Sequence, residues 1–286
     1  MPMLLLTSRA SAAGDIRRRR RLTVMFAAIA VAYLSSPIPF VHAQDMTQFL
    51  DLSSDEFTKS EMSRADVEAM VAKRNSEEPM DLSARRLNKL DLSGLDLSNA
   101  NLQSARINGT DFSKADLDGA VLDQAWGLNA NFSGASLKGA SLFATQLMGA
   151  KLDGADFTGA RVAADFSRAS LKGARFDGAD LSADMKNQSM GLMRGVFTSS
   201  DLEGASFRDA NLARVVLEYA RLGKADLTNA NLMGSELGGA DLTGATVTGA
   251  QFTNADVNSA RLIGLEGRDS AVGLDATVNL DRAFTD

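Results

Sequence analysis

The sequence contains no cysteine and a single histidine, His42, and proline and aromatic residues are scarce. A chain without thiols can form neither a disulfide nor a cysteine-based zinc site. His42 lies in an N-terminal segment that we interpret below as a removable leader, so the remaining chain has no imidazole either. Ser-His-Asp catalysis, Cys-His catalysis and most transition-metal sites are therefore excluded. We expect no enzyme activity and no cofactor, and a fold held together by packing and backbone hydrogen bonds.

Residues 1–43 have the organisation of a secretory signal. Five consecutive arginines, Arg17 to Arg21, precede an apolar run from Leu22 to about Leu34, and Val41-His42-Ala43 suits signal peptidase. We predict cleavage before Gln44 and a periplasmic mature protein. The apolar run is shorter than the ~20 residues of a membrane-spanning helix, so no stable membrane span is expected after cleavage. An uncleaved anchor is the alternative, and the arginine run also hints at twin-arginine export.

Loss of the leader makes the chain strongly acidic. The leader holds six of the 30 Lys and Arg residues and one of the 36 Asp and Glu residues, which leaves 24 basic against 35 acidic residues, a net charge of −11. Such a chain repels phosphate, so we expect no nucleic-acid partner.

From residue 80 to 264 the sequence repeats every five residues. A large apolar residue is the centre of each unit, and an alanine usually stands two places before it. Centres recur from Leu82 to Val162, from Phe166 to Leu181 and from Leu192 to Leu262, with Gly127 as the exception. Five is the period of neither an amphipathic helix nor an alternating strand. An internal repeat this regular determines the fold.

The repeated units resemble those of the pentapeptide-repeat family. Its signature, A-[DN]-L-x-x, is met by the segments ADLDG, ANFSG, ADFTG, ADLSA, ANLMG and ADLTG. The resemblance implies an all-β fold, a right-handed quadrilateral parallel β-helix with four pentapeptides per coil. In such a coil the large residue and the alanine point inward and the other three positions face water. About nine coils stacked at the inter-strand spacing would give a rod roughly 43 Å long.

We expect the segments on either side of the repeats to form the two ends of the rod. In the N-terminal segment, residues 44–79, the stretch 53–75 predicts a short capping helix that starts after Ser63 and carries Val67, Met70 and Val71 at helical spacing. A loose linker helix is the alternative. Residues 265–286 lose the five-residue period. They form a C-terminal tail or cap, and the sequence leaves open whether this tail covers the last coil or stays disordered.

Three irregularities interrupt the repeats and are candidate functional loops. Gly127 takes the place of a centre beside an outward Trp126; the step from Val162 to Phe166 is four residues; and the step from Leu181 to Leu192 is eleven. Tolerated drift within the coil is the alternative for each.

The eleven-residue step contains a methionine cluster. Met185, Met190 and Met193 are weak candidate ligands for Cu(I), because thioether sulfur is a soft ligand. Methionine is also the usual filler of irregular core gaps, which is the interpretation we favour. If the step takes up two positions of the coil, then Phe157, Phe176 and Phe197 stack on one side.

We conclude from the sequence that the protein is an exported, non-catalytic scaffold presenting a rigid rod to a protein partner. Large outward aromatics anchor interfaces, so the candidate partner-binding residues are Trp126, Phe143 and Tyr219. The irregular stretches 126–129 and 182–191 are the expected binding region.

Two alternatives remain, besides the methionine-based copper-binding protein. Some members of the resembled family mimic duplex DNA and protect type II topoisomerases, but the leader argues against that role. So do basic residues among the outward acids: Arg86, Arg106, Arg161, Arg175, Arg221 and Arg261. The resemblance also implies a possible homodimer, joined end to end.

Overall fold

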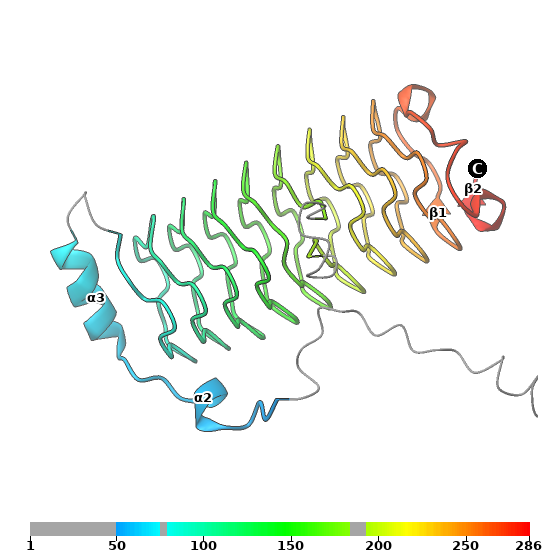
Figure 1. The fold of residues 1–286 in the computed structure, drawn as a ribbon. Coiled ribbons are helices and arrows are strands. Elements are labelled where there is room, and N and C mark those ends of the chain that lie inside the picture. Colours follow the sequence, from blue (N-terminus) through cyan, green and yellow to red (C-terminus); the bar gives the residue numbers. More distant parts are fainter. Residues whose placement is uncertain (1–49, 75–78, 184–192) are drawn as a thin grey trace, which may run out of the picture. The chain divides into compact units, whose positions relative to one another are not determined.

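The computed structural model describes residues 50–74, 79–183 and 193–286, and the chain from Ala43 to Asp286 forms one compact unit. The predicted leader, its cleavage site before Gln44, and Met185 and Met190 lie outside the described residues. Within the unit, the repeats form coils stacked one on another from residue 80 to the C-terminal tail (Figure 1).

The coils pair with one another through parallel bridges between residues twenty positions apart, such as Asp81 with Asn101. Each coil has four faces of five residues, which we number 1 to 4 after the inward centres of the first coil, Leu82, Leu87, Leu92 and Leu97 respectively. The amide of Leu82 donates to the carbonyl of Asn101 at 2.7 Å, and the same bond recurs on every face. The predicted four-sided parallel β-helix is confirmed by this ladder.

The corners between faces are β-turns whose third residue has a positive φ, as in type II turns. At the corner after Leu97, the amide of Ala100 donates to the carbonyl of Leu97 at 3.0 Å, and Asn99 has a φ of 56°. Glycine stands at many of these corners, for instance Gly154 with a φ of 66°. The last position of the pentapeptide thus has a backbone conformation that glycine and asparagine adopt most readily, although larger residues such as Gln124 and Arg214 also stand there.

The interior is filled by the centres and the alanines that precede them, as expected. Leu227 and Ala225 are both fully buried. At Gly127 the backbone stays in register, since its amide donates to the carbonyl of Gln146 at 2.7 Å. A Cβ there would lie 2.8 Å from Leu147 Cδ2 and 3.3 Å from Ile107, so these neighbouring side chains fill the vacant position. The prediction of an irregular backbone at 126–129 is wrong.

The short step from Val162 to Phe166 removes a corner residue without breaking the ladder. Ala163 and Ala164 are buried, neither has a positive φ, and the bridges continue through Asp165 to Val196. The lost residue is the one that would have made the β-turn.

The long step is an insertion between two faces. Asp165 and Val196 are bridge partners although they are 31 positions apart, eleven more than a regular coil. Phe197 therefore follows Leu181 as the next centre, and the amide of Gly195 donates to the carbonyl of Leu181 at 2.9 Å at the base of the insertion. The predicted centre Leu192 lies outside the described residues.

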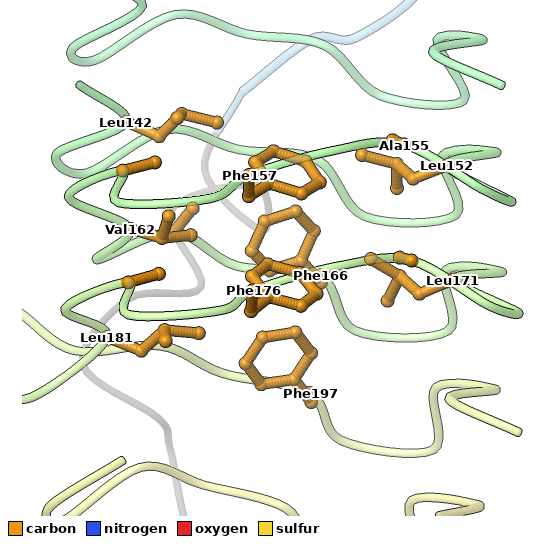
Figure 2. Packing of buried hydrophobic residues seen from close by; sticks show 14 of the residues in the cluster. Leu142, Leu152, Ala155, Phe157, Val162, Phe166, Leu171, Phe176, Leu181 and Phe197 are labelled. Atoms are coloured by element: carbon orange, nitrogen blue, oxygen red, sulfur yellow. The ribbon is translucent and has the colours of Figure 1, made fainter. Parts of the chain in front are cut away.

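This register places the phenylalanines around the insertion on two faces, and in Figure 2 the rings of Phe157 and Phe176 alternate with those of Phe166 and Phe197. On face 4, Phe176 stacks between Phe157, at 4.7 Å between ring centroids, and Phe207, at 4.9 Å. On face 2, Phe166 stacks on Phe197 at 4.9 Å. The prediction that Phe197 shares a column with Phe157 and Phe176 is wrong, because the insertion takes up no positions of the coil.

Residues 50–74 form two short helices before the first coil. Helix α2 comprises Asp55–Thr58 and helix α3 comprises Arg64–Lys73. Ser63 and Asp66 form a capping box at the start of α3, where the sequence predicted the helix to begin. Val67 is fully buried in the core cluster, and Met70 and Val71 pack against it half-buried.

The tail, residues 265–286, continues the coil with six-residue faces. Its bridging residues are Glu266, Val272, Val278 and Phe284, which pair with residues of the last regular coil. Strand β1, Arg261–Leu262, pairs in parallel with strand β2, Phe284–Thr285, and the 3-10 helices η3, Arg268–Ser270, and η4, Leu280–Arg282, supply corner residues. The five-residue period is lost, as expected, but a six-residue period replaces it and the tail folds onto the last coil.

Candidate protein-interaction face

In the regular coils, face 2 carries more large apolar residues at its outward positions than any other face; face 1 carries three, Val121, Phe143 and Met233. Face 2 carries five, Trp126, Leu128, Met148, Val196 and Val216. The outward positions of faces 3 and 4 are occupied almost entirely by Asp, Ser, Thr, Lys, Arg and Gly. Apolar side chains that a coil directs away from its own core are available to pack against another segment.

The first coils of face 2 contact the segment around helix α2 through a ladder of two asparagines. Asn88 Nδ2 donates to the carbonyls of Glu56 and Lys59, both at 3.0 Å. One coil further, Asn108 Nδ2 donates to Asn88 Oδ1 at 3.0 Å and to the carbonyl of Phe57 at 3.4 Å. Both asparagines are buried, and Asn108 Oδ1 accepts from the amide of Leu128 at 2.9 Å. The ladder thus connects three coils to the backbone of residues 56–59.

Phe57 covers Trp126 on the third coil. The two rings meet edge to face with centroids 5.5 Å apart, and the Arg106 guanidinium lies 5.3 Å from the Phe57 ring and 6.0 Å from the Trp126 ring. Arg106 Nη2 also pairs with Glu56 Oε1 at 2.7 Å. Only 8% of Trp126 is exposed, so the expectation of an exposed indole is wrong. Sequence reasoning missed Phe57 because 69 residues separate it from Trp126 and no periodicity links them.

Further along face 2, outward side chains are also buried. The exposed fractions are 3% for Gln146, 4% for Asp165, 3% for Val196 and 0% for Val216. In the described part of the chain, no outward position of faces 3 and 4 is buried in this way. Face 2 is therefore a covered surface over most of its length.

The other two predicted aromatic anchors lie elsewhere. Tyr219 is 66% exposed at the corner after face 2, and its ring lies over the next coil, where a Cβ on Gly239 would come within 2.6 Å of Tyr219 Cδ1. Phe143 is half-buried on face 1. The structure does not bring Trp126, Phe143 and Tyr219 into one patch, because they occupy different coils and faces.

One methionine of the cluster, Met193, lies in the described residues. Met193 is half-buried at the base of the insertion, whereas Met185 and Met190 fall outside the described residues. Across residues 50–74, 79–183 and 193–286, no three or more His, Cys, Asp or Glu side chains gather into a potential metal site. The copper hypothesis stays a prediction.

The recurrent aspartates of the pentapeptides take part in the turns. Asp91 Oδ1 accepts from the hydroxyl and the amide of Ser93, at 2.6 and 3.0 Å, and these bonds hold the pKa of Asp91 below its ordinary value. Hydrogen bonds from Arg74 and then from Ser98 lower the pKa of Asp96 to about 2. Carboxylates ionised and bound in this way support the backbone rather than exchange protons.

Arginines of the outward positions neutralise many neighbouring acids. Arg221 pairs with Asp201 at 3.0 Å across one coil, Arg208 with Asp226 at 2.8 Å, and Arg194 with Glu236 at 2.9 Å. Basic side chains are therefore interspersed among the acidic ones along the described coils.

Comparison with known proteins agrees with the coil geometry. The family model of pentapeptide repeats matches eight copies over residues 81–126, 129–161, 162–183, 196–229 and 230–264, more than half of the chain. No curated protein sequence matches the chain. No helix of the described residues is both long enough and apolar enough to span a bilayer.

Several solved structures are similar over much of their length. HetL, a pentapeptide-repeat protein involved in heterocyst differentiation regulation in the cyanobacterium Nostoc sp., is 25% identical over 78% of this chain and 94% of its own, with a TM-score of 0.32. Full-length QnrB1, a plasmid-mediated fluoroquinolone resistance protein, is 19% identical over 70% and 93%, with a TM-score of 0.32. A protein of the Arabidopsis thaliana thylakoid lumen is 23% identical over 58% and 70%, with a TM-score of 0.21.

Proposed function

The chain belongs to the pentapeptide-repeat family, and on that premise we propose that it is an exported, non-catalytic scaffold that binds a protein partner in the periplasm. The family's fold is a right-handed quadrilateral β-helix, and the four-sided coils agree with it. The observation that carries the proposal is the contrast between the faces. The polar faces use their carboxylates in turns and ion pairs, whereas face 2 directs apolar side chains outward.

Export is supported by the composition of residues 1–43, with their arginine run, apolar run and Val41-His42-Ala43. We expect N-terminal sequencing of the protein from a periplasmic fraction to begin at Gln44. Recovery of the intact leader on a cytoplasmic protein would contradict both export and the periplasmic role.

Partner binding is tested by chemical crosslinking in the periplasm followed by purification of the exported protein. We expect one or a few defined protein adducts. Tyr219→Lys, at the exposed corner after face 2, should reduce them, and Asn229→Lys, at the equivalent exposed corner of the polar face 4, is the matched control. Equal adducts from both variants, at unchanged melting temperature, would move the binding surface away from face 2.

We also propose that residues 50–74 cap the first coil. The supporting contacts are hydrogen bonds to carbonyls on the open edge of that coil. The Glu61 amide donates to the carbonyl of Arg86 at 2.9 Å, and Arg64 donates to the carbonyls of Asp91 and Ser93, at 2.9 and 3.2 Å. Arg74 Nη1 donates to the carbonyl of Ser98 at 3.1 Å. Native proteins cover such strand edges to prevent association.

The opposite end supports the proposal of a homodimer. The last turn exposes Val272, Val278 and Phe284, whose exposed fractions are 54%, 47% and 56%. A second copy packed on this end would bury them. Sedimentation equilibrium should show a dimer that Phe284→Asp dissociates, and a wild-type protein that stays monomeric at all concentrations would contradict this.

A further inference from the structure

The segment that crosses face 2 binds through a small set of contacts. Its backbone carbonyls at Glu56, Phe57 and Lys59 accept from the Asn88 and Asn108 amides. Three side chains provide further contacts with these coils: the Glu56 carboxylate on Arg106, the Phe57 ring on Trp126, and the Ser60 hydroxyl, which donates to the carbonyl of Arg86 at 3.0 Å. A peptide is therefore recognised by its main chain, by an acidic side chain, by the aromatic side chain that follows it and by a hydroxyl group three residues after the aromatic one.

The rest of this segment is bound weakly. The described hydrogen bonds of residues 50–55 are all local, such as those of Ser53 and Ser54 with Asp51, and Leu50 is 40% exposed. Helix α2 has four residues, and such a short helix has little stability of its own. Displacing residues 54–60 from face 2 would thus leave the coils, and the contacts of α3 with the first coil, in place.

The charges around this surface also indicate that a peptide bound to it is acidic. Arg86 and Arg106 stand at outward positions of the first two coils of face 2, and they pair with Glu61 and Glu56 respectively. Buried polar groups at this surface also need a partner, because Asn88 and Asn108 are only 2% and 8% exposed. Water or a second peptide would have to replace the carbonyls that they now contact.

We propose that the first three coils of face 2 form a peptide-binding site that residues 54–60 occupy in cis, and that a partner segment takes their place. The partner segment carries an acidic residue directly followed by an aromatic residue in an otherwise acidic stretch. Its biological use rests on the proposed scaffold function, whereas the binding chemistry is tested independently with the protein alone.

The single tryptophan makes the site directly observable, since Trp126 lies in it and the chain contains no other. The test uses residues 43–286, which form a compact unit, with Glu56→Ala and Phe57→Ala introduced together. The indole emission of this variant should shift to longer wavelength than in the wild type, because the ring covering Trp126 is gone. A synthetic peptide of residues 50–62 contains no tryptophan and should reverse the shift saturably when titrated into the millimolar range, the effective concentration of a segment on a short linker.

Two comparisons make the result specific. The same peptide with Phe57→Ala should not reverse the shift. Adding Arg106→Gln to the protein variant should weaken peptide binding by about tenfold or more, as expected for a charge-assisted contact. Arg168→Gln, at an exposed corner beyond the site, should leave it unchanged.

Three outcomes would overturn the proposal. An unshifted emission in the double variant would mean that Phe57 does not cover Trp126, and an absence of saturable peptide binding with unchanged circular dichroism would mean that face 2 does not accept a peptide in trans. A wild-type dimer that excess peptide dissociates would assign the site to a second copy of this chain. By contrast, peptide binding without any periplasmic adduct would leave the site standing and count against the scaffold function.

Discussion

The register of the coil after the insertion can be measured by a pair of double-mutant cycles. The first cycle combines Phe166→Leu with Phe197→Leu, whose rings stack at 4.9 Å with an interplanar angle of 10°. The second combines Phe176→Leu with Phe207→Leu, whose rings stack on face 4 at 4.9 Å with an interplanar angle of 5°. If the insertion took up two positions of the coil, Phe197 would lie on face 4 and Phe207 on face 2, so neither pair would stack.

The expected magnitudes follow from the ring contacts. Leucine preserves most of the volume, so each single substitution should cost about 1.5 kcal/mol or less. A stacked aromatic pair contributes roughly 0.5–1.5 kcal/mol beyond the burial of its area, which is the coupling expected between Phe166 and Phe197. The same coupling is expected between Phe176 and Phe207, because their rings stack in the same way.

The assay is urea unfolding of residues 43–286 followed by far-UV circular dichroism, with Trp126 fluorescence as a second probe. Coincident transitions from the two probes are required, because a repeat array can unfold in parts. Coupling below about 0.5 kcal/mol in both cycles would refute the register derived from the bridge pattern, because neither pair of rings would then stack.

Further predictions concern the core, the turns and the acid stability. Leu227→Lys should lower the free energy of unfolding by about 4 kcal/mol or more, since it buries an unpaired charge. Asn229→Lys, at an outward corner, should cost less than about 1 kcal/mol. Equal melting temperatures of the two variants would contradict the inward position of Leu227. Gly154 has a φ of 66° with no atom within 4 Å of an added Cβ, so in thermal melts Gly154→Val should cost about 1–2 kcal/mol more than Gly154→Asn. Since the folded pKa of Asp96 is lowered to about 2 from 3.8, its contribution is present above pH 3.8 and is lost as the pH falls towards 2. Arg74→Ala should reduce this loss of unfolding free energy in acid, measured by titrating stability with pH. The reduction should be less than about 1 kcal/mol, because the Asp96 carboxylate is 52% exposed. An unchanged titration would exclude the Arg74–Asp96 pair as the cause of the lowered pKa.

A structural feature of this protein could be predicted from the sequence where it depends on contacts between residues close together in the chain. Leu227 and Ala225 could be placed inside the coil from their spacing alone, because the repeat places equivalent positions in equivalent environments on every face. The start of α3 was equally predictable, since Ser63 and Asp66 form their capping box within one turn. The candidate face was not predictable as a whole. Trp126 was identified, but as an exposed residue, and Phe57 was not identified at all.

Periodicity by itself thus determined the family, the inward and outward positions and the turn residues, because each depends on the neighbouring few residues and on the coil they repeat. Only the tertiary structure decided where the eleven extra residues leave the coil, since a sequence count cannot distinguish an insertion from two irregular faces. Only the tertiary structure placed Phe57 on Trp126, because that contact arises where a segment outside the repeats crosses three coils. The six-residue faces of the tail emerged in the same way. The residues that follow the bridging positions are Gly267, Gly273, Asn279 and Thr285 instead of large apolar residues, so the spacing was visible only in the bridges of Val272, Val278 and Phe284.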